Sequence, residues 1–329
     1  MSLDLQKHFK KFHEAIELGN LDDTKILREK RDLLIAELNE NLEDGLSFAH
    51  FNQGSYAMGT GIFPKDGDYD IDVGLLFNAT TDDYKNSVEL KEKVYDALDR
   101  ASRNADIRRS CVTVQYVREN VPQYHVDLAI YAKDPNEYSN DIYIAKGKRN
   151  SDADKKFWEK SDPKGLLAKV NKYSDDPDER AQMRRVIRYL KKWRDKTLGG
   201  EKPYSIALTV CVLNHFIPKR NFNATYNDLE ALILLVDTLL FVWGDGLKAM
   251  LPVEPFCDLN ADLTDIQMSN FKKTMETLKG ALLEAADCDL ETDACKILRK
   301  QFGDDFPVPT EAETSQKTKR AVAPAGASA

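Results

Sequence analysis

The amino-acid sequence predicts an α+β protein in which a lobe built on a mixed β-sheet precedes a helical lobe. Up to about residue 160, amphipathic helical stretches alternate with short runs rich in Val, Ile and Tyr, which are typical of strands. From Pro163 onward the pattern is helical almost throughout. We therefore expect residues 1–160, including the N-terminal helices, to form the first lobe and residues 161–305 to form the second, with a cleft between them.

The first lobe is expected to contain helices at 4–18, 22–42 and 82–101, and strands at 108–117, 123–132 and 141–145, besides an acid-bearing strand near residue 70. In the second lobe, breaks at Gly, Pro and one long loop separate the expected helices, which are 163–173, 178–198, 204–217, 226–243, 265–286 and 291–302. Residues 306–329 are rich in Pro, Ala, Ser and Thr and are expected to form a disordered tail.

The composition is that of an ordinary soluble protein, with 42% hydrophobic and 31% charged residues in 329. A net charge of −8 argues against a stable nucleic-acid partner. Five cysteines without a CxxC pair argue against structural zinc and suit a reducing cytoplasm. We find neither a signal peptide nor an apolar stretch long enough for a membrane span, so we expect a cytoplasmic protein without membrane contact.

The segment Phe51–Phe77, FNQGSYAMGTGIFPKDGDYDIDVGLLF, holds the first candidate site. Side chains alternate along a strand, so Asp70 and Asp72 project from one face and Ile71 from the other. Two neighbouring carboxylates repel each other unless a cation lies between them, and Mg²⁺ prefers such oxygen ligands. Asp68 has the same parity and is the alternative first ligand.

A third acid follows on the later strand YHVDLAIYA, where Asp127 lies between two apolar residues. Three carboxylates on two strands of one sheet suit two-metal phosphoryl or nucleotidyl transfer. The alternative is a solvated strand edge without chemistry. The upstream Gly54–Ser55 turn favours the catalytic interpretation, with Asp70, Asp72 and Asp127 as catalytic and metal-binding residues.

The motifs GSYAMGT, DYDIDVG and HVDLAIY resemble those of the polymerase-β-like nucleotidyltransferases. Within that superfamily, the segments WEKSDPKGL, RRVIRYLKKWRD and PYSIAL are similar to the bacterial relatives of animal cyclic GMP-AMP synthase, the CD-NTases, and among them to the Vibrio-type enzymes. The similarity extends from about residue 50 to 215 and is looser beyond. It implies a polymerase-β-like nucleotidyltransferase lobe with the active site in the cleft beside the helical lobe.

The resemblance implies roles for particular residues. The three aspartates would bind two Mg²⁺ ions, for which Mn²⁺ is a possible substitute. It implies that Gly54, Ser55, Lys191 and Ser205 contact the phosphates of the nucleotide. Gln53 and Tyr204 are further candidates for nucleotide binding, Tyr204 by stacking on a base, although packing in the core is the alternative for this tyrosine. From the residues alone, Lys192 is an alternative to Lys191. In the late loop, Glu254, Asp258 and Asn260 are candidates for reading a base edge.

The function implied is synthesis of a cyclic di- or trinucleotide second messenger from ATP, GTP or other nucleoside triphosphates, with release of pyrophosphate, in bacterial antiphage (CBASS) signalling. A separate effector protein would bind the product. The C-terminal AGASA also resembles family tails on which ubiquitin-transfer-like partners act, although a plain disordered end explains the composition equally well. The alternatives are a template-independent transferase acting on an RNA end and an inactive nucleotide-binding scaffold.

Overall fold

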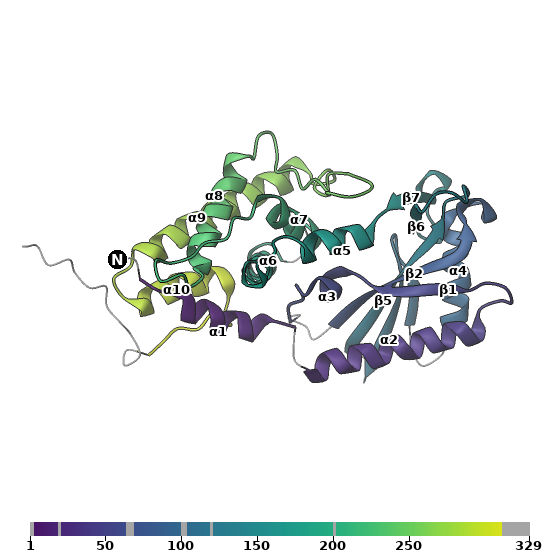
Figure 1. Ribbon diagram of the computed structural model, residues 1–329, viewed down its shortest axis with the longest axis horizontal. Helices are drawn as coiled ribbons and strands as arrows, with labels where there is room; N and C mark the ends of the chain where they lie inside the picture. Colours follow the sequence, from purple (N-terminus) through teal and green to yellow (C-terminus); the bar gives the residue numbers. More distant parts are fainter. Residues whose placement is uncertain are drawn as a thin grey trace, which may run out of the picture.

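The computed structural model describes residues 3–18, 21–63, 69–99, 104–118, 121–199 and 202–310. Figure 1 shows a lobe containing the sheet beside a lobe made of helices, with the short helices α3 (Gly54–Met58) and α5 (Pro163–Asn171) between the two. The α+β class, the mixed sheet and the helical C-terminal lobe expected from the sequence are confirmed.

In the described part of the chain the sheet has seven strands, of which five follow the order β1–β2–β5–β4–β3, while β6 pairs with β5 and β7. Strands β2 and β5 are parallel and the other pairs are antiparallel, which makes the sheet mixed. The strands are β1 (Phe48–Asn52), β2 (Tyr69–Thr80), β3 (Asn104–Ile107), β4 (Val112–Arg118), β5 (Val121–Lys133), β6 (Ile142–Lys146) and β7 (Phe157–Ser161).

Helices α2 (Leu21–Asn41) and α4 (Ser87–Leu98) cover one face of this sheet. Their apolar side chains share a core with alternate residues of the central strands, including Ile71, Val73, Val126 and Leu128, all completely buried. Because strand side chains alternate, the residues between these four point to the opposite face, toward the helical lobe. Two short 3₁₀ helices, Thr81–Asp83 and Ala153–Lys155, lie in connections.

The helical lobe contains α6 (Pro177–Thr197), α7 (Ser205–His215), α8 (Asp228–Phe241), α9 (Asp265–Asp287) and α10 (Glu291–Phe302). The first helix of the chain, α1 (Gln6–Ile16), also packs in this lobe, although its position in the sequence is within the expected first lobe. Phe12 of α1 stacks on Tyr189 of α6 with ring centroids 5.2 Å apart, and Phe9 contacts Phe306 at 5.3 Å. Phe306, which we expected at the start of the tail, is therefore buried in the helical core.

Other differences from the expectation are local. Helix α4 begins at Ser87 instead of residue 82, because the Asn86 side chain accepts a hydrogen bond from Val88 N at 3.0 Å and caps the helix there. Strands β1, β3 and β7 were not expected; each is only four or five residues long. Most of the expected tail, residues 311–329, lies outside the described residues.

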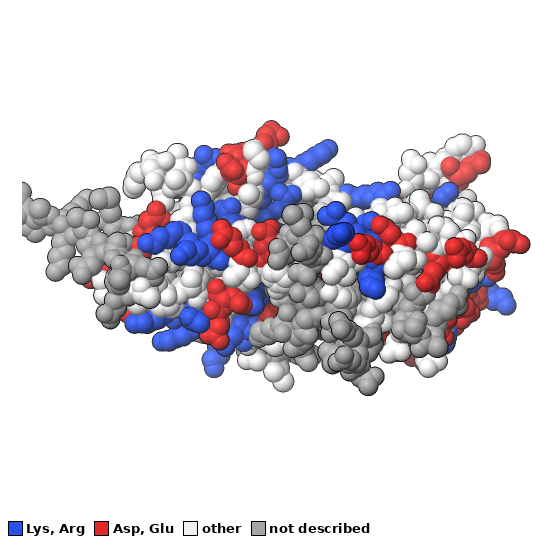
Figure 2. Space-filling model, turned by 90° about the horizontal axis from the view of Figure 1, so that it is seen from below, with Lys and Arg blue, Asp and Glu red and all other residues white. Residues whose placement is uncertain are grey.

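Two surface properties bear on function. On the face shown in Figure 2, Lys and Arg side chains are interspersed with Asp and Glu over both lobes. Among the described residues, no helix combines the length and the apolar character needed to span a bilayer.

Candidate active site

The three aspartates lie together on the face of the sheet that is turned toward the helical lobe. Strands β2 and β5 pair in parallel, and their register places Asp72 directly beside Asp127 and Asp70 beside His125. The apolar neighbours Ile71 and Val126 pair in the same register and are buried on the other face. The alternation expected from the sequence therefore brings the acids to one place. Asp68, the alternative ligand, lies outside the described residues.

The pKa of Asp72 reflects its burial and the charges of the neighbouring carboxylates. Burial, followed by the negative charges of Asp70 and Asp127, raises the pKa of Asp72 to about 7. A carboxyl group with such a pKa is partly protonated at neutral pH unless a positive charge stabilises its ionised form. The site therefore favours a cation.

Gly54 lies directly against Asp72. Its φ of +64° is in the left-handed region, and a Cβ built on it would lie 1.8 Å from Asp72 Oδ2. The preceding backbone is tied to the same strand, since Gln53 N donates a hydrogen bond to Asp72 O at 3.0 Å. Only glycine lets the chain pass this close, so Gly54 and Ser55 are held beside the acids at the start of α3.

The donor set suits a hard divalent cation in its chemistry, because three carboxylates share one face and one of them has a raised pKa. Within the described ranges, however, no group of three His, Cys, Asp or Glu side chains is already arranged to hold a metal ion. The fit of these residues to Mg²⁺ thus rests on the type and backbone placement of the donors, not on a closed set of ligands.

A cavity of about 840 Å³ joins the two lobes at this point. From the sheet lobe it is lined by Gly54, Ser55, Asp70, Asp72 and His125. From the helical lobe it is lined by the predicted nucleotide contacts Lys191, Tyr204 and Ser205, together with Arg194 and Thr209. The cleft expected from the sequence thus gathers most of the predicted site residues around one space.

Lys191 is buried in the wall of this cavity. Its Nζ donates to Thr60 O at 3.0 Å, in the segment that follows α3. Burial lowers the pKa of its ammonium group to about 8, although the carboxylate of Asp70 acts in the opposite direction. The alternative, Lys192, forms an ion pair with Asp305, away from the cleft. Of the two lysines, Lys191 is therefore the one that lines the cavity.

Ser205 begins α7, and its Oγ accepts a hydrogen bond from Arg194 Nη1 at 2.7 Å. Arg194 is itself buried, and its guanidinium also pairs with Asp195. Sequence reasoning missed Arg194, although it lies one turn after Lys191 on the same helix. Tyr204 is half-exposed at the mouth of the cavity, where Lys202 Nζ lies 5.4 Å from its ring centroid.

Two predicted residues do not line the cavity. Asp127 lies beside Asp72 and is bound by Thr113, whose Oγ1 is 2.6 Å from Asp127 Oδ1. Gln53 precedes α3, and its side chain accepts a hydrogen bond from Tyr131 OH at 2.9 Å. Sequence reasoning missed both Thr113 and Tyr131, because cross-strand partners depend on the register.

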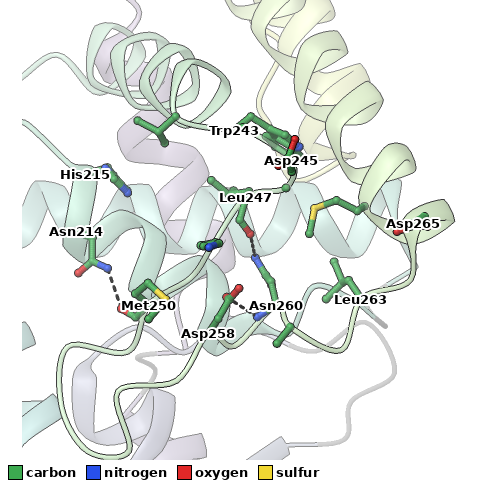
Figure 3. Close-up of a pocket in the computed structure, with 16 residues that line it drawn as sticks. Asn214, His215, Trp243, Asp245, Leu247, Met250, Asp258, Asn260, Leu263 and Asp265 are labelled. Atoms are coloured by element: carbon green, nitrogen blue, oxygen red, sulfur yellow. Dashed lines mark hydrogen bonds between the residues drawn. The ribbon is translucent and has the colours of Figure 1, made fainter.

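The late-loop candidates for base reading do not face this cleft. Glu254 pairs with Lys160 at 3.0 Å. Asp258 and Asn260 line a separate cavity of about 720 Å³ in the helical lobe, shown in Figure 3. There, Asp258 Oδ1 accepts from Asn260 N at 3.0 Å and Asn260 Nδ2 donates to Leu247 O at 2.8 Å, so both side chains stabilise the loop.

Two family models match the chain and together cover more than half of it. Residues 49–131 match the nucleotidyltransferase domain of the cyclic GMP-AMP synthase DncV-like family, and residues 180–311 match the C-terminal domain of cyclic GMP-AMP synthase. The chain belongs to the DncV-like nucleotidyltransferase family. The recognition from sequence is confirmed, and the two matched segments fall in the two lobes on either side of the cavity.

Individual proteins similar to this DncV-like chain support the same family assignment. It is 29% identical over 218 residues to a cyclic GMP-AMP synthase from Escherichia albertii, an alignment that covers 62% of this chain and only 45% of that protein. The Vibrio cholerae dinucleotide cyclase DncV, solved with GTP and 5MTHFGLU2, superposes with a TM-score of 0.63 and 17% identity over 95% of this chain and 89% of that one. The Bradyrhizobium diazoefficiens CD-NTase CdnG, solved with GTP, superposes with a TM-score of 0.71 and 14% identity over 92% of this chain and 96% of that one.

Proposed function

We propose that this DncV-like nucleotidyltransferase makes a cyclic di- or trinucleotide from ATP, GTP or other nucleoside triphosphates and releases pyrophosphate. One observation carries the proposal above all others. Asp70, Asp72 and Asp127 share one face of the sheet, and the cavity at this face is closed on its other side by Lys191 and Ser205. The acidic groups thus lie on one side of the cavity, and the lysine and serine that would bind phosphate lie on the other.

Each group has a distinct task in the proposed reaction. The three aspartates would hold Mg²⁺, or Mn²⁺ in its place, and the bound ions would activate the attacking ribose hydroxyl and stabilise the leaving pyrophosphate. Lys191 would neutralise phosphate charge from the helical side. Ser55 and the backbone at Gly54 would contact the triphosphate beside the acids, where the Asp72 side chain leaves no room for a Cβ at position 54.

The nature of the acceptor separates this proposal from its alternatives. In a cyclase, a ribose hydroxyl of a second nucleotide attacks the α-phosphate, and a second transfer in the same site closes the ring. A cavity of about 840 Å³ is within the range typical of small-ligand sites, in keeping with nucleotides as both donor and acceptor. On the part of the face in Figure 2 that the described residues form, Lys and Arg are interspersed with Asp and Glu. An RNA-end transferase would instead need a continuous basic surface for its acceptor.

The biological setting is part of the same proposal. The relatives include a cyclic GMP-AMP synthase and CD-NTases, and we propose that this chain likewise produces a signal for antiphage (CBASS) defence in the cytoplasm. A separate effector protein would bind the product. A ubiquitin-transfer-like partner acting on the C-terminal tail belongs to the proposal through sequence resemblance alone.

The function is tested by incubating purified full-length protein with the four labelled nucleoside triphosphates and Mg²⁺, then digesting with phosphatase. We expect a small phosphatase-resistant product, identified by mass spectrometry, that is absent without divalent cation. The double variant Asp70→Ala, Asp72→Ala should make none of it. Extension of added RNA would instead identify an RNA-end transferase. Absence of turnover under all conditions, also with partner proteins, would favour a nucleotide-binding scaffold.

A further inference from the structure

Asp127 has a close neighbour on the side away from the other two acids. Strand β5 lies between β2 and β4, so Asp127 has Asp72 on one side and Thr113 on the other. Thr113 is its register partner on β4, is almost completely buried, and places Oγ1 2.6 Å from Asp127 Oδ1.

The direction of this hydrogen bond follows from the chemistry. An ionised carboxylate only accepts hydrogen bonds, so the Thr113 hydroxyl is the donor. A separation of 2.6 Å is typical of an O–H group bound to an anionic oxygen, a bond roughly twice as strong as one between neutral groups. The contact is therefore a strong constraint on the orientation of the carboxylate.

The hydroxyl is held from its other side as well. Cys111 Sγ lies 3.5 Å from Thr113 Oγ1. Because the hydroxyl proton is directed to Asp127, the thiol must be the donor in this second contact. Burial raises the pKa of the Cys111 thiol to about 12, so it keeps the proton that it donates. Cys111, Thr113 and Asp127 thus form a directed chain of hydrogen bonds.

We propose that Thr113 is a positioning residue, which holds Oδ1 of Asp127 toward β4 and so sets the orientation in which this carboxylate meets a divalent cation shared with Asp70 and Asp72. In the described part of the chain, no hydrogen bond to Asp127 Oδ2 is found, which leaves that oxygen for the cation. The inference rests on the function proposed above.

The test measures metal binding directly. Mn²⁺ is titrated into the full-length protein, and free Mn²⁺ is followed by electron paramagnetic resonance. Thr113→Val keeps the branched shape but removes the hydroxyl, and Thr113→Ser keeps the hydroxyl. Groups that orient metal ligands typically contribute about 10–100-fold to affinity, so the Val variant should bind Mn²⁺ weaker by that factor, and the Ser variant should stay close to the parent.

Thr238→Val is the matched control. The Thr238 hydroxyl bonds to Leu234 O within helix α8, and Thr238 does not line the cleft. This variant should bind Mn²⁺ as the parent does. Melting temperatures by circular dichroism verify folding, and if Thr113→Val does not fold, Thr113→Ala is compared with Thr238→Ala in the same titration.

A double-mutant cycle then decides whether Thr113 acts through Asp127. In an Asp127→Ala background, Thr113→Val should weaken Mn²⁺ binding no further. The inference is overturned if folded Thr113→Val binds Mn²⁺ like the parent, or if it weakens binding equally in both backgrounds. If the parent binds Mn²⁺ and Thr113→Val binds it equally well, this inference is contradicted but the proposed function is not. A parent that binds no Mn²⁺ and makes no product contradicts the proposed function too.

Discussion

Gly54 and Asp72 are packed so closely that a single methyl group at position 54 would fall 1.8 Å from a carboxylate oxygen. Neither real Cβ atoms nor carboxylates tolerate that distance, so Asp72 would have to leave its place beside Asp127 or α3 would have to move. The two halves of the candidate site, the glycine turn and the acids, are thus dependent on each other.

Gly54→Ala should therefore remove activity by displacing Asp72. A displacement of about 1 Å in a reacting group can reduce the rate roughly 100-fold, and we expect at least that loss in product formation. Gly45→Ala is the matched control, since Gly45 has a φ of +87° but nothing within 4 Å of a built Cβ. It tests backbone strain alone and should keep full activity. Equal activity of the two variants would contradict the importance of this contact.

Lys191→Met should lower activity strongly while changing stability at pH 7 only slightly. The pKa of Lys191 in the folded protein is about 8, below the usual value near 10.4, because burial disfavours the charged form. The unfolded chain therefore binds more protons between these values, and stability from this group rises with pH from about 8 to about 10. The Met variant should lack this rise and lose at most little stability at pH 7, while its turnover falls about 100-fold through lost phosphate contacts.

Chemical denaturation at pH 7 to 10 and the product assay measure the two effects. Lys192→Met is the control on the same helix, because Lys192 pairs with Asp305 instead of facing the cleft. It should retain turnover. A Lys191→Met protein with normal turnover would show that Lys192 or another group binds the phosphates.

Much of the site was predictable because it depends on strand periodicity. The alternation of Asp70, Ile71 and Asp72 determines which side chains share a face, and this holds whatever the partner strand is. The position of α6 was predictable for a similar reason, since a long amphipathic pattern defines a helix well. Contacts between distant segments were not predictable. The register that joins Thr113 to Asp127, and the packing of α1 in the helical lobe, depend on tertiary structure that periodicity does not encode.

The burial of Lys91 is another feature that the sequence pattern does not predict. A lysine on helix α4 would ordinarily be exposed, yet Lys91 is completely buried, and its Nζ donates to the carbonyl oxygens of Arg108, Arg109 and Gly147 at 2.8 to 2.9 Å. Burial lowers the pKa of this lysine to about 7. These bonds tie α4 to the turn that presents Arg108 to the cavity.

Lys91→Met should destabilise the sheet lobe by about 3 kcal/mol, since the buried carbonyl of Gly147 and the partly buried carbonyls of Arg108 and Arg109 lose a donor at roughly 1–3 kcal/mol for each buried group, while a buried charge is removed. Urea denaturation at neutral pH measures the loss. Lys93→Met, two residues away, removes a lysine whose ion pair with Glu43 is exposed to solvent, and should cost less than about 1 kcal/mol. Similar losses in both variants would show that the three carbonyl bonds contribute little.

Asp228 should make the helical lobe sensitive to acid. Its carboxylate is completely buried at the start of α8, where Arg185 donates two hydrogen bonds to it at 2.7 and 2.8 Å and Tyr189 OH donates a third at 3.0 Å. Burial alone would raise the pKa of Asp228, but the hydrogen bonds and charge of Arg185 outweigh it and lower the pKa. The stabilisation from a carboxylate with a lowered pKa is complete above its unfolded value, about 4, and disappears as the pH falls through the folded value.

Asp228→Asn should therefore cost about 3 kcal/mol at pH 7, because the largely buried Arg185 loses its counter-charge. The variant should also show a shallower loss of stability than the parent below pH 4, since it has already lost the group that titrates there. Urea denaturation from pH 3 to 7 measures both effects, with exposed Asp245→Asn as the control that should follow the parent within about 0.5 kcal/mol. If the loss of stability below pH 4 is the same in Asp228→Asn as in the parent, other carboxylates govern acid unfolding. The contact between Arg185 of α6 and Asp228 of α8 would then withstand protonation of Asp228.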